Sequence, residues 1–338
     1  MNILQNVSLR PYNTFGIAVK AKAFLSVTTP LQLQKALRLE AYAERFIISG
    51  GSNMLLTKDV DALVLHIALK GISIVEETDE AVIIKAMAGE NWHELVQWSL
   101  ARNYGGLENL SLIPGNTGTA PIQNIGAYGV ELKDIFVGCE AMEVKTQELV
   151  EFSKEDCKFG YRDSIFKNEA KDRYIITSVL LKLTKKDHKL LTFYGAIETE
   201  LKDMGVVNPT IQNISDAVIS IRQRKLPNPK EIGNSGSFFK NPVISKKVFV
   251  QFQKEHPNAP FYELPDGQFK IPAGWLIEQC GFKGKRFGDA GVHKNQALVL
   301  VNYGDASGME IWELAMKIKS SVKTSFGIDI QPEVNIIN

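Results

Sequence analysis

The sequence predicts a protein of the α+β class, and three observations support this. Short strand-like runs alternate with amphipathic helices over the first 70 residues. Strand-like runs dominate from residue 71, and helices mix with strands again after residue 225. A chain of 338 residues should form about two domains and bury a core without help from disulfides.

The first region reads as a small unit in which strands alternate with a helix. Pro30 is well placed at a helix start, because the first helical turn leaves its amide hydrogens unused, and Leu33 and Leu37 recur on one face. Gly50 and Gly51 follow the second strand and predict a tight turn there. The strands are predicted at Ala23–Val27, Phe46–Ile48 and Ala62–Leu65.

The middle region is rich in strands and contains one helix and one long loop. The helix is predicted from Asn91 to Asn103, with Asn91 and Glu94 spaced as a capping box. Residues 105–130 lack hydrophobic periodicity and are rich in Gly, Asn, Thr, Pro and Ala, and a loop of that length is usually functional when its low charge argues against disorder. Strands are predicted at 72–75, 82–84, 135–144, 148–152 and 174–183.

The last region follows a predicted helix over Thr210–Arg224. The segment 225–229 ends that helix, because its prolines cannot continue it. Ser307 and Glu310 are spaced as a second capping box. Further helices are predicted at 246–256, 273–280 and 307–326, a strand at 297–301, and a strand-like run at 328–337.

The overall composition excludes several classes of protein. Lys and Arg total 39 against 38 Asp and Glu, and the net charge of +1 argues against DNA, RNA or an anionic membrane as the main partner. The three cysteines lack the spacing of a redox motif or zinc site, which suits a reducing compartment. The sequence shows no signal-peptide pattern and no apolar stretch long enough to span a bilayer. We therefore expect a cytoplasmic protein with no nucleic-acid partner and no membrane insertion.

Common catalytic motifs are absent or incomplete. No two of the 26 glycines lie two positions apart, so the G-x-G-x-x-G dinucleotide fingerprint does not occur, and there is no Walker-type loop. His93 opens a segment that begins like a metalloprotease motif, but Gln97 replaces the second histidine, and we interpret the segment as helix surface. Ser164 and Lys167 match an acyltransferase pattern without its companion motifs. The five histidines are isolated, so no metal site is expected.

Glycine-rich turns with hydrogen-bonding side chains are the remaining signal. Backbone N–H groups in such turns can hold phosphate, because several donors point at one anion. The pair Gly50–Gly51 follows a strand, and the loop at 105–130 adds polar side chains among residues small enough for close backbone approach. The sequence therefore favours a phosphate-rich ligand on a scaffold of helices and strands, without revealing the reaction.

Five segments together resemble one family of flavoenzymes. Ile48–Asn53 resembles the first flavin-phosphate loop of the vanillyl-alcohol-oxidase-like FAD fold. Ile113–Gly129 resembles the second loop, in the version found in the UDP-N-acetylenolpyruvoylglucosamine reductase family. The match to that family runs from near residue 10 to the C-terminus. The other three segments are Tyr161–Ser164, Gly233–Pro242 and Gln331–Val334.

The resemblance implies a two-subdomain FAD-binding fold of the vanillyl-alcohol-oxidase/PCMH type plus a C-terminal α/β substrate-binding domain. The first FAD-binding subdomain is expected at 1–70, joined by the C-terminal strand 328–338, the second at 71–205, and the substrate-binding domain at 206–327. The segments Pro257–Tyr262 and Ala273–Cys280 resemble the subtype that closes a tyrosine-bearing loop over its substrate.

The activity that the resemblance implies is a reduction in peptidoglycan precursor synthesis. The enolpyruvyl group of a UDP-linked amino sugar would be reduced to give UDP-N-acetylmuramate, with NADPH as co-substrate and FAD as cofactor. Because neither flavin-loop segment contains His or Cys, the FAD is expected to be noncovalent. A monomer is expected.

The site residues are carried over position by position from the resemblance. Arg162 matches the catalytic arginine, Ser237 the proton donor and Glu333 the second catalytic residue. An arginine suits the task, because the substrate carboxylate must accept further negative charge and the guanidinium offers it a permanently charged, planar fork. The implied substrate contacts are Tyr194, Lys225, Asn241, Tyr262 and Gln296. The implied cofactor contacts are Gly50, Gly51, Ser52, Asn53, Pro114, Gly115, Gly118, Gln123, Asn124, Gly126, Ala127, Tyr128 and Arg222.

Small departures from the family pattern lie near the expected flavin site. Asn116 and Thr117 stand where Ser and Val are more usual, Thr119 where Ala is usual, and Ser235 where Ala is common. Their added polar groups could change hydrogen bonding to the flavin.

Two alternatives remain open at this point. The first keeps the fold and changes the chemistry to an FAD-dependent oxidase of a small alcohol or sugar. The second is a nucleotide-sugar binding protein without catalysis. The presence of Arg162, Ser237 and Glu333 together argues against the second alternative.

Overall fold

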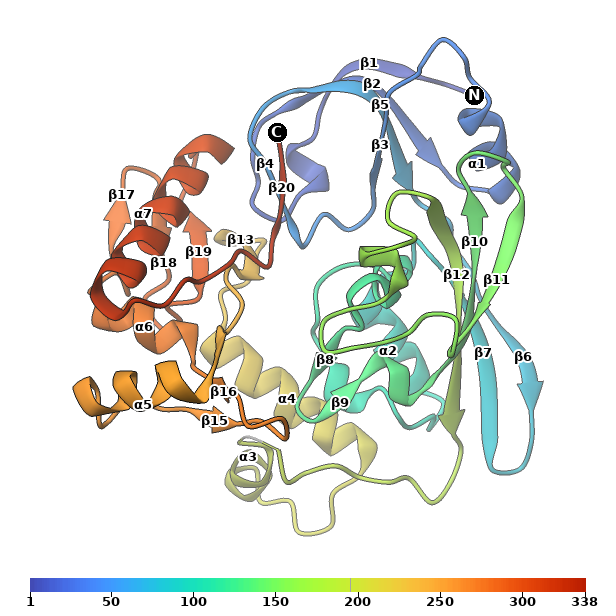
Figure 1. Cartoon of the computed structure of the whole chain (residues 1–338). Coiled ribbons are helices and arrows are strands. Elements are labelled where there is room, and N and C mark those ends of the chain that lie inside the picture. Colours follow the sequence, from blue (N-terminus) through green and yellow to red (C-terminus); the bar gives the residue numbers. More distant parts are fainter. Residues whose placement is uncertain (195) are drawn as a thin grey trace. The chain divides into compact units, whose positions relative to one another are not determined.

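The computed structural model describes residues 1–194 and 196–338, and the chain divides into two compact units (Figure 1). The first unit comprises Met1–Val7, Ala21–Gly50 and Val60–Arg224. The second unit comprises Ser8–Lys20, Gly51–Asp59 and Lys225–Asn338. Each unit therefore collects segments from distant parts of the sequence. The three-part division at residues 70, 205 and 327 stays a prediction.

A four-stranded sheet with the order β1-β2-β5-β3 begins the first unit. Strands β2 and β3 both run parallel to β5, as the predicted alternation of strands and helix requires. Helix α1 begins at the predicted Pro30, and the Thr29 side chain accepts a hydrogen bond from the Gln32 N–H. The elements are β1 (Leu4–Ser8), β2 (Lys20–Val27), α1 (Pro30–Leu37), β3 (Arg45–Ile48) and β5 (Val60–Ile67).

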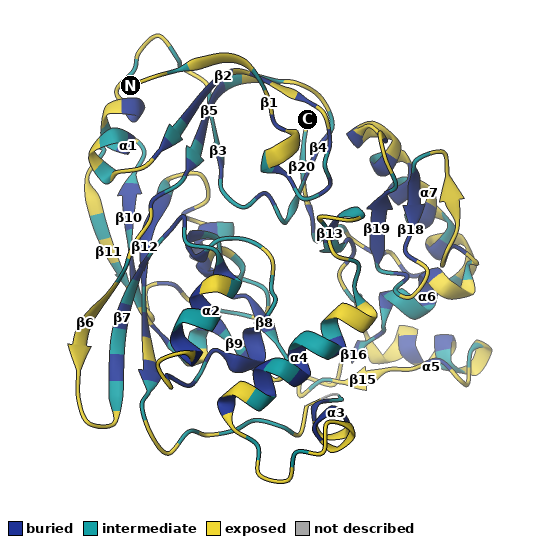
Figure 2. Cartoon of the chain, turned by 180° about the vertical axis from the view of Figure 1, so that it is seen from behind, coloured by how far each residue is buried: buried dark blue, intermediate teal, exposed yellow. Residues whose placement is uncertain are grey.

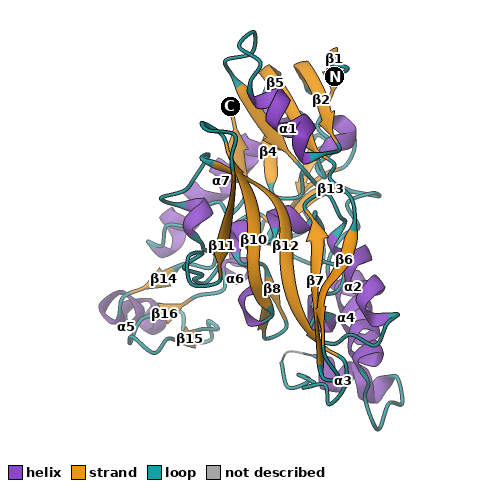
Figure 3. Ribbon diagram, turned by 90° about the vertical axis from the view of Figure 1, so that its right-hand side faces the viewer, coloured by secondary structure: helices purple, strands orange, loops and turns teal. Residues whose placement is uncertain are grey.

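A five-stranded antiparallel sheet with the order β11-β10-β12-β7-β6 forms the rest of the first unit's framework (Figure 3). The central strand β12 buries Val179, Leu181 and Leu183, whereas the edge strand β6 is largely exposed (Figure 2). The predicted strands are confirmed, each within a few residues of its expected bounds. They are β6 (Ile72–Glu77), β7 (Ala81–Met87), β10 (Phe136–Glu143), β11 (Leu149–Ser153) and β12 (Tyr174–Thr184).

The two sheets of the first unit share buried side chains. One apolar cluster joins Leu25 and Leu65 of the parallel sheet to Met142 and Ile175 of the antiparallel sheet. A second cluster packs α2 (Trp92–Leu100) through Trp92, which is 1% exposed, against the antiparallel sheet. The first half of the predicted capping box forms, because the Asn91 side chain accepts from the Glu94 N–H. The unit's other helices are α3 (Ile197–Asp203), which the sequence analysis missed, and α4 (Ile211–Lys225).

The polar segment at 105–130 is a chain of tight turns. It holds three 3₁₀ turns and a two-residue hairpin pair, which fold it closely onto α2 and the antiparallel sheet. These elements are η2 (Glu108–Leu110), η3 (Thr117–Thr119), η4 (Pro121–Gln123), β8 (Gly126–Ala127) and β9 (Val130–Glu131).

The second unit is built on an antiparallel sheet with the order β13-β19-β18-β17. Helix α7 begins with the complete capping box predicted at Ser307 and Glu310. The strand predicted over 328–337 is shorter than expected, and only β20 (Asn335–Ile337) forms, parallel to β4 (Met54–Leu56). The other elements are β13 (Gly233–Ser237), β14 (Val243–Ile244), α5 (Lys246–Glu255), β15 (Tyr262–Glu263), β16 (Phe269–Lys270), α6 (Ala273–Gln279), β17 (Arg286–Phe287), β18 (Ala290–Val292), β19 (Val299–Asn302) and α7 (Gly308–Phe326).

No helix within residues 1–194 and 196–338 combines the length and the apolar character that crossing a membrane would need.

Candidate active site

The two predicted phosphate loops touch each other in the first unit. A Cβ atom on Gly50 would lie 2.8 Å from the Gly115 Cα and 3.0 Å from the Asn116 N. Only glycine fits at this approach, because real side chains do not tolerate carbon contacts that short. The Asn116 side chain also donates a hydrogen bond to the Ser49 hydroxyl over 3.0 Å. Within the first unit, the start of the first loop therefore touches the second loop backbone to backbone.

The second loop is fastened to the sheet behind it. The Thr117 N–H bonds the Glu90 carbonyl over 2.8 Å, and the Gly118 N–H bonds the Ala88 carbonyl over 2.9 Å. A Cβ on Gly118 would lie 2.5 Å from the Ala88 Cβ, so this position also needs glycine. These bonds use the Thr117 and Gly118 amides to fix the path of the loop, so a bound anion would have to be held by other amides of the two loops.

Three residues that differ from the family pattern, Thr117, Thr119 and Ser235, use their hydroxyl groups to bind main-chain carbonyls. Thr117 Oγ1 donates to the Glu90 carbonyl over 3.1 Å, and Thr119 Oγ1 donates to the Asn116 carbonyl over 2.8 Å. Ser235 Oγ donates to the Met54 carbonyl over 3.2 Å, within the second unit. The two threonines therefore reinforce the second loop, and Ser235 binds the residue that follows the first loop.

Asn124 lies at the centre of the second loop's C-terminal half and has no exposed surface. Its side-chain amide donates to the Glu131 carboxylate over 3.0 Å and to the Gly160 carbonyl over 2.9 Å. Its side-chain oxygen accepts from the Lys133 N–H over 3.0 Å. Asn124 therefore ties the loop to the segment before Arg162, and its role as a cofactor contact stays a prediction.

Arg162 lies beside the same loop and is held in an unusual backbone conformation. Its φ angle is 54°, and those of Asn124 and Tyr128 are 43° and 51°. Its guanidinium donates to the Gly126 carbonyl, and Lys167 Nζ donates to the Arg162 carbonyl over 3.0 Å. Left-handed conformations at non-glycine residues cost free energy and cluster at functional sites.

A second arginine, Arg222, approaches this group from α4. Its Nε atom is buried and has no hydrogen-bond partner among the described residues. Burial lowers the pKa of Arg222, an effect that Tyr128 opposes and the positive charge of Arg162 strengthens. Burial in turn raises the pKa of Tyr128. A buried guanidinium with an unpaired donor beside another arginine is suited to a ligand of negative charge.

In the second unit, backbone pairing brings the predicted proton donor and the predicted second catalytic residue onto neighbouring segments. Ser237 ends strand β13, and the Glu333 N–H bonds the carbonyl of the next residue, Phe238, over 2.8 Å. Phe239 and Pro332 form an isolated antiparallel bridge. This pairing fixes the main chain at both residues.

The segment that carries Ser52 and Asn53 lies beside the same pairing. The Asn335 backbone and side-chain amides both donate to the Asn53 carbonyl, over 3.2 and 2.9 Å. Gly51 has a φ angle of +57°, and a Cβ there would lie 2.0 Å from the Tyr12 carbonyl oxygen. Residues from both ends of the sequence therefore meet around Ser237 and Glu333 within this unit.

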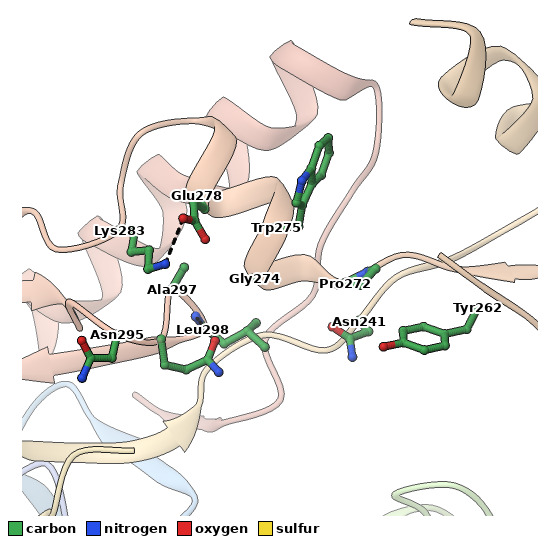
Figure 4. Close-up of a pocket in the computed structure, with 11 residues that line it drawn as sticks. Asn241, Tyr262, Pro272, Gly274, Trp275, Glu278, Lys283, Asn295, Ala297 and Leu298 are labelled. Atoms are coloured by element: carbon green, nitrogen blue, oxygen red, sulfur yellow. Dashed lines mark hydrogen bonds and ion pairs between the residues drawn. The ribbon is translucent and has the colours of Figure 1, made fainter. Parts of the chain in front are cut away.

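A pocket in the second unit brings together three of the five predicted substrate residues. Asn241, Tyr262 and Gln296 line a cavity of about 310 Å³ (Figure 4). The Asn241 side chain accepts from the Ala273 N–H over 2.9 Å, which fixes it at the start of α6. Tyr262 is 59% exposed on the β15 hairpin, and its hydroxyl points toward Asn241 in Figure 4.

The pocket is connected to the predicted proton donor through the neighbouring strand β19 and the residue before it. Ser237 pairs with Val299 of β19, and the Phe238 N–H bonds the carbonyl of Leu298, which lines the pocket. Three other lining residues, Trp275, Glu278 and Lys283, were not predicted as site residues, although the first two lie in the segment Ala273–Cys280. The i, i+3 spacing of Trp275 and Glu278 on one helix face was the available signal, and a 2.9 Å ion pair joins Glu278 to Lys283.

The other two predicted substrate residues are placed differently. Tyr194 belongs to the first unit, is 54% exposed, and lies against Gly129 of the second loop. Lys225 is exposed at the end of α4 and is not among the residues that line the pocket.

The fold and the paired loops define an FAD-binding oxidoreductase. Residues 21–153 match a family model described as an FAD binding domain, and this range contains both loops. The loops suit FAD, because two glycine-bearing turns meet without intervening side chains and a buried guanidinium nearby keeps an unpaired donor.

Comparison with known proteins then identifies the family. Residues 228–337 match the model of the UDP-N-acetylenolpyruvoylglucosamine reductase C-terminal domain. Curated reductases of that name from Flavobacterium johnsoniae and Pseudomonas putida are 57% and 50% identical, and the alignments cover 100% and 98% of both chains. A solved reductase of this type from Thermus caldophilus shares the fold, with a TM-score of 0.69 and 24% identity over 100% of both chains. The chain belongs to the UDP-N-acetylenolpyruvoylglucosamine reductase family.

Family membership confirms the predicted fold class, enzyme class and cofactors. The protein is an α+β oxidoreductase that uses FAD, takes its electrons from NADPH and serves peptidoglycan precursor synthesis.

The contact between the two loops predicts a specific loss in Gly50→Ala. The added methyl group would push Gly50 away from Gly115, so we expect the dissociation constant for FAD to rise at least about tenfold. Titration of the apoprotein with FAD, followed by fluorescence, measures this constant. Gly205→Ala is the control, because Gly205 has a φ angle of +72° but open space around it. It should lose about 1 kcal/mol of folding stability and keep its FAD affinity. Unchanged affinity in Gly50→Ala would show that the loops need not touch.

The three hydrogen bonds of Asn124 predict a large effect on folding stability. Asn124→Ala removes three hydrogen bonds made by a fully buried side chain, so its free energy of unfolding should fall by about 3 kcal/mol. Urea unfolding measures this change. Asn103→Ala is a matched control, because Asn103 has a φ angle of 56° and an exposed side chain. It should lose only about 1 kcal/mol. Equal losses would mean that the backbone conformation, not the hydrogen bonds, sets the cost.

Proposed function

We propose that this chain's residues reduce the enolpyruvyl group of UDP-N-acetyl-3-O-(1-carboxyvinyl)-glucosamine to UDP-N-acetylmuramate, with Arg162, Ser237 and Glu333 as catalytic residues. The observation that carries the proposal is the backbone pairing that brings Ser237 and Glu333 together beside a pocket lined by predicted substrate residues. Family membership supplies the reaction class.

The paired glycine loops hold the cofactor noncovalently. When bound, FAD carries two electrons from NADPH to the vinyl carbon of the substrate. The amides around Gly50 and Gly115 bind its phosphates, and Arg222 supplies the permanent positive charge nearby. The other proposed contacts are Gly51, Ser52, Asn53, Pro114, Gly118, Gln123, Asn124, Gly126, Ala127 and Tyr128.

Arg162 stabilises the charge that develops on the substrate. Reduction at the vinyl carbon leaves negative charge on the neighbouring carbon and on a carboxylate that is already ionised. A guanidinium suits this position, because it keeps its proton and matches the planar carboxylate. The hydrogen bond from its guanidinium to the Gly126 carbonyl fixes the orientation of the guanidinium before the substrate binds.

Ser237 gives its hydroxyl proton to the neighbouring carbon. A serine hydroxyl is a weak acid, so the basicity of that carbon and the fixed geometry of the strand end must carry the step. Glu333 assists on the neighbouring segment as the second catalytic residue.

The second unit's pocket binds the nucleotide sugar. Asn241, Tyr262 and Gln296 supply hydrogen bonds, and Tyr262 closes over the substrate as in the tyrosine-loop subtype. Tyr194 and Lys225 contribute further contacts, with Lys225 as a point charge for the pyrophosphate. The protein works in the cytoplasm as a monomer.

The central test is an anaerobic redox experiment. The purified protein should be yellow, NADPH should bleach it, and the enolpyruvyl nucleotide sugar should restore the colour rapidly. Reoxidation by oxygen or a small alcohol's product, but not by this compound, would favour the oxidase alternative. A colourless protein that FAD cannot reconstitute would favour a binding protein without catalysis.

The proton-donor role predicts that Ser237→Ala separates the two half-reactions. Bleaching by NADPH should stay within about twofold of the parent rate, while reoxidation by the enolpyruvyl substrate should slow at least about a thousandfold. Stopped-flow absorbance measures both. Ser245→Ala, in the same unit, removes an exposed serine without a side-chain cap bond and should change neither rate. Equal losses in both half-reactions of Ser237→Ala would contradict the role.

The pocket position of Tyr262 predicts a loss of substrate affinity in Tyr262→Phe. Losing one hydrogen bond to a charged group should raise the dissociation constant of the nucleotide sugar about tenfold, with bleaching by NADPH unchanged. Calorimetric titration of the oxidised holoenzyme measures the constant. Tyr303→Phe, also in the second unit but outside the pocket lining, is the control. An unchanged constant in Tyr262→Phe would argue against closure by this tyrosine.

A further inference from the structure

His93, set aside above as helix surface, makes a specific contact with the backbone. It is the second residue of α2 and is half-buried. Its Nδ1 atom accepts a hydrogen bond from the Leu112 N–H over 3.0 Å. The side chain therefore does more than cover the helix surface. The contact could not be predicted, because it joins residues that the sequence gives no reason to pair.

Leu112 is the strained residue just before the second phosphate loop. Its φ angle is 58°, a conformation that costs free energy for a branched, bulky side chain. The loop residues Ile113–Gly115 follow directly. A hydrogen bond that holds Leu112 therefore sets the direction in which the loop leaves it.

Side chains from two helices hold three consecutive residues at this point. Trp92 Nε1 donates to the Leu110 carbonyl over 3.0 Å, and the Ser111 hydroxyl bonds the Ser215 hydroxyl over 2.8 Å. The His93–Leu112 bond completes the series. On the far side of the turn, the Trp92 N–H bonds the Gly115 carbonyl over 3.0 Å. The first two residues of α2 therefore hydrogen-bond the main chain on both sides of the point where the second loop begins.

The imidazole must be neutral to accept this bond, because both nitrogens of an imidazolium are donors. Burial lowers the pKa of His93, the positive charge of Arg222 on α4 lowers it further, and Glu94 on its own helix opposes them. The neutral form is therefore the one that the folded protein favours.

We propose that His93 is a positioning residue, whose neutral imidazole holds Leu112 in its left-handed conformation and thereby shapes the second phosphate loop for FAD. This inference rests on the proposed FAD site. It concerns the precision of the loop, so it is tested by cofactor affinity rather than by turnover.

An isosteric pair of variants tests the contact. Asn places its side-chain oxygen where the Nδ1 of His93 lies, whereas Leu has the same branched shape without an acceptor. His93→Leu should raise the FAD dissociation constant of the apoprotein about tenfold, and His93→Asn should stay within about threefold of the parent. Urea unfolding of each apoprotein shows whether both variants fold. If the Leu and Asn variants bind FAD equally well, the acceptor role is overturned.

The pH dependence provides a second readout. The bond is present above the ordinary histidine pKa of 6.5 and is lost as the pH falls below it, through the lowered pKa of the folded protein. FAD affinity of the parent should therefore fall as the pH drops below 6.5, and His93→Asn should remove this step. His293→Asn is the control, because burial also lowers the pKa of His293, which belongs to the second unit and not to either phosphate loop, and this variant should keep the step.

Two results would overturn the proposal here. Affinity that rises as the pH falls would mean that an imidazolium pairs with the anionic cofactor. A pH step that persists in His93→Asn would assign the titration to another group. Failure of the parent protein to bind FAD at any pH would instead overturn the proposed function, so the two failures can be told apart.

Discussion

The structure of the first unit depends on the contact between Gly50 and Gly115. A Cβ on Gly50 would lie 2.8 Å from the Gly115 Cα, so the first loop has no room for a side chain where it meets the second. The surrounding features maintain this approach. Asn116 ties the loops together, Asn124 anchors the chain that follows, and α2 holds the residues that come before. The left-handed conformations at Leu112, Asn124 and Tyr128 are the strain that this arrangement stores.

Charge in this protein works locally. The net charge of +1 supplies almost no long-range attraction, although FAD, NADPH and the nucleotide sugar are all anions. The structure instead concentrates positive charge at Arg162 and Arg222 and buries the second of them. A buried guanidinium attracts an anion more strongly than an exposed one, because water screens it less. A neutral surface and a strongly anion-binding site are therefore compatible.

Sequence patterns predicted those parts of the fold that local physics determines. The capping box at Ser307, the helix start at Pro30 and the long strands of the antiparallel sheet all formed as expected, because each has a periodic or capping signal within a few residues. The hairpin strands of two residues and the seven-residue helix α3 carry too little periodicity to be predicted. The strand at 328–337 was predicted too long, since only Asn335–Ile337 has a partner strand. Within the site, the motif residues could be named from the resemblance, whereas the contact of His93 and the pocket position of Trp275 depend on tertiary packing.

The parallel pairing of β20 with β4 explains why residues from opposite ends of the chain meet in the second unit. Parallel neighbours cannot be joined by a tight turn, so the chain must travel a long way between them. Here it travels from Leu56 to Asn335, and in between it adds β5, the first unit's antiparallel sheet and the second unit's pocket. The same pairing that closes this small sheet sets Asn53 against Asn335, two residues from Glu333. The main chain at Glu333 is therefore positioned by the strand that follows it. The pairing of Glu333 with the residue after Ser237 depends on Asn335–Ile337 binding to β4.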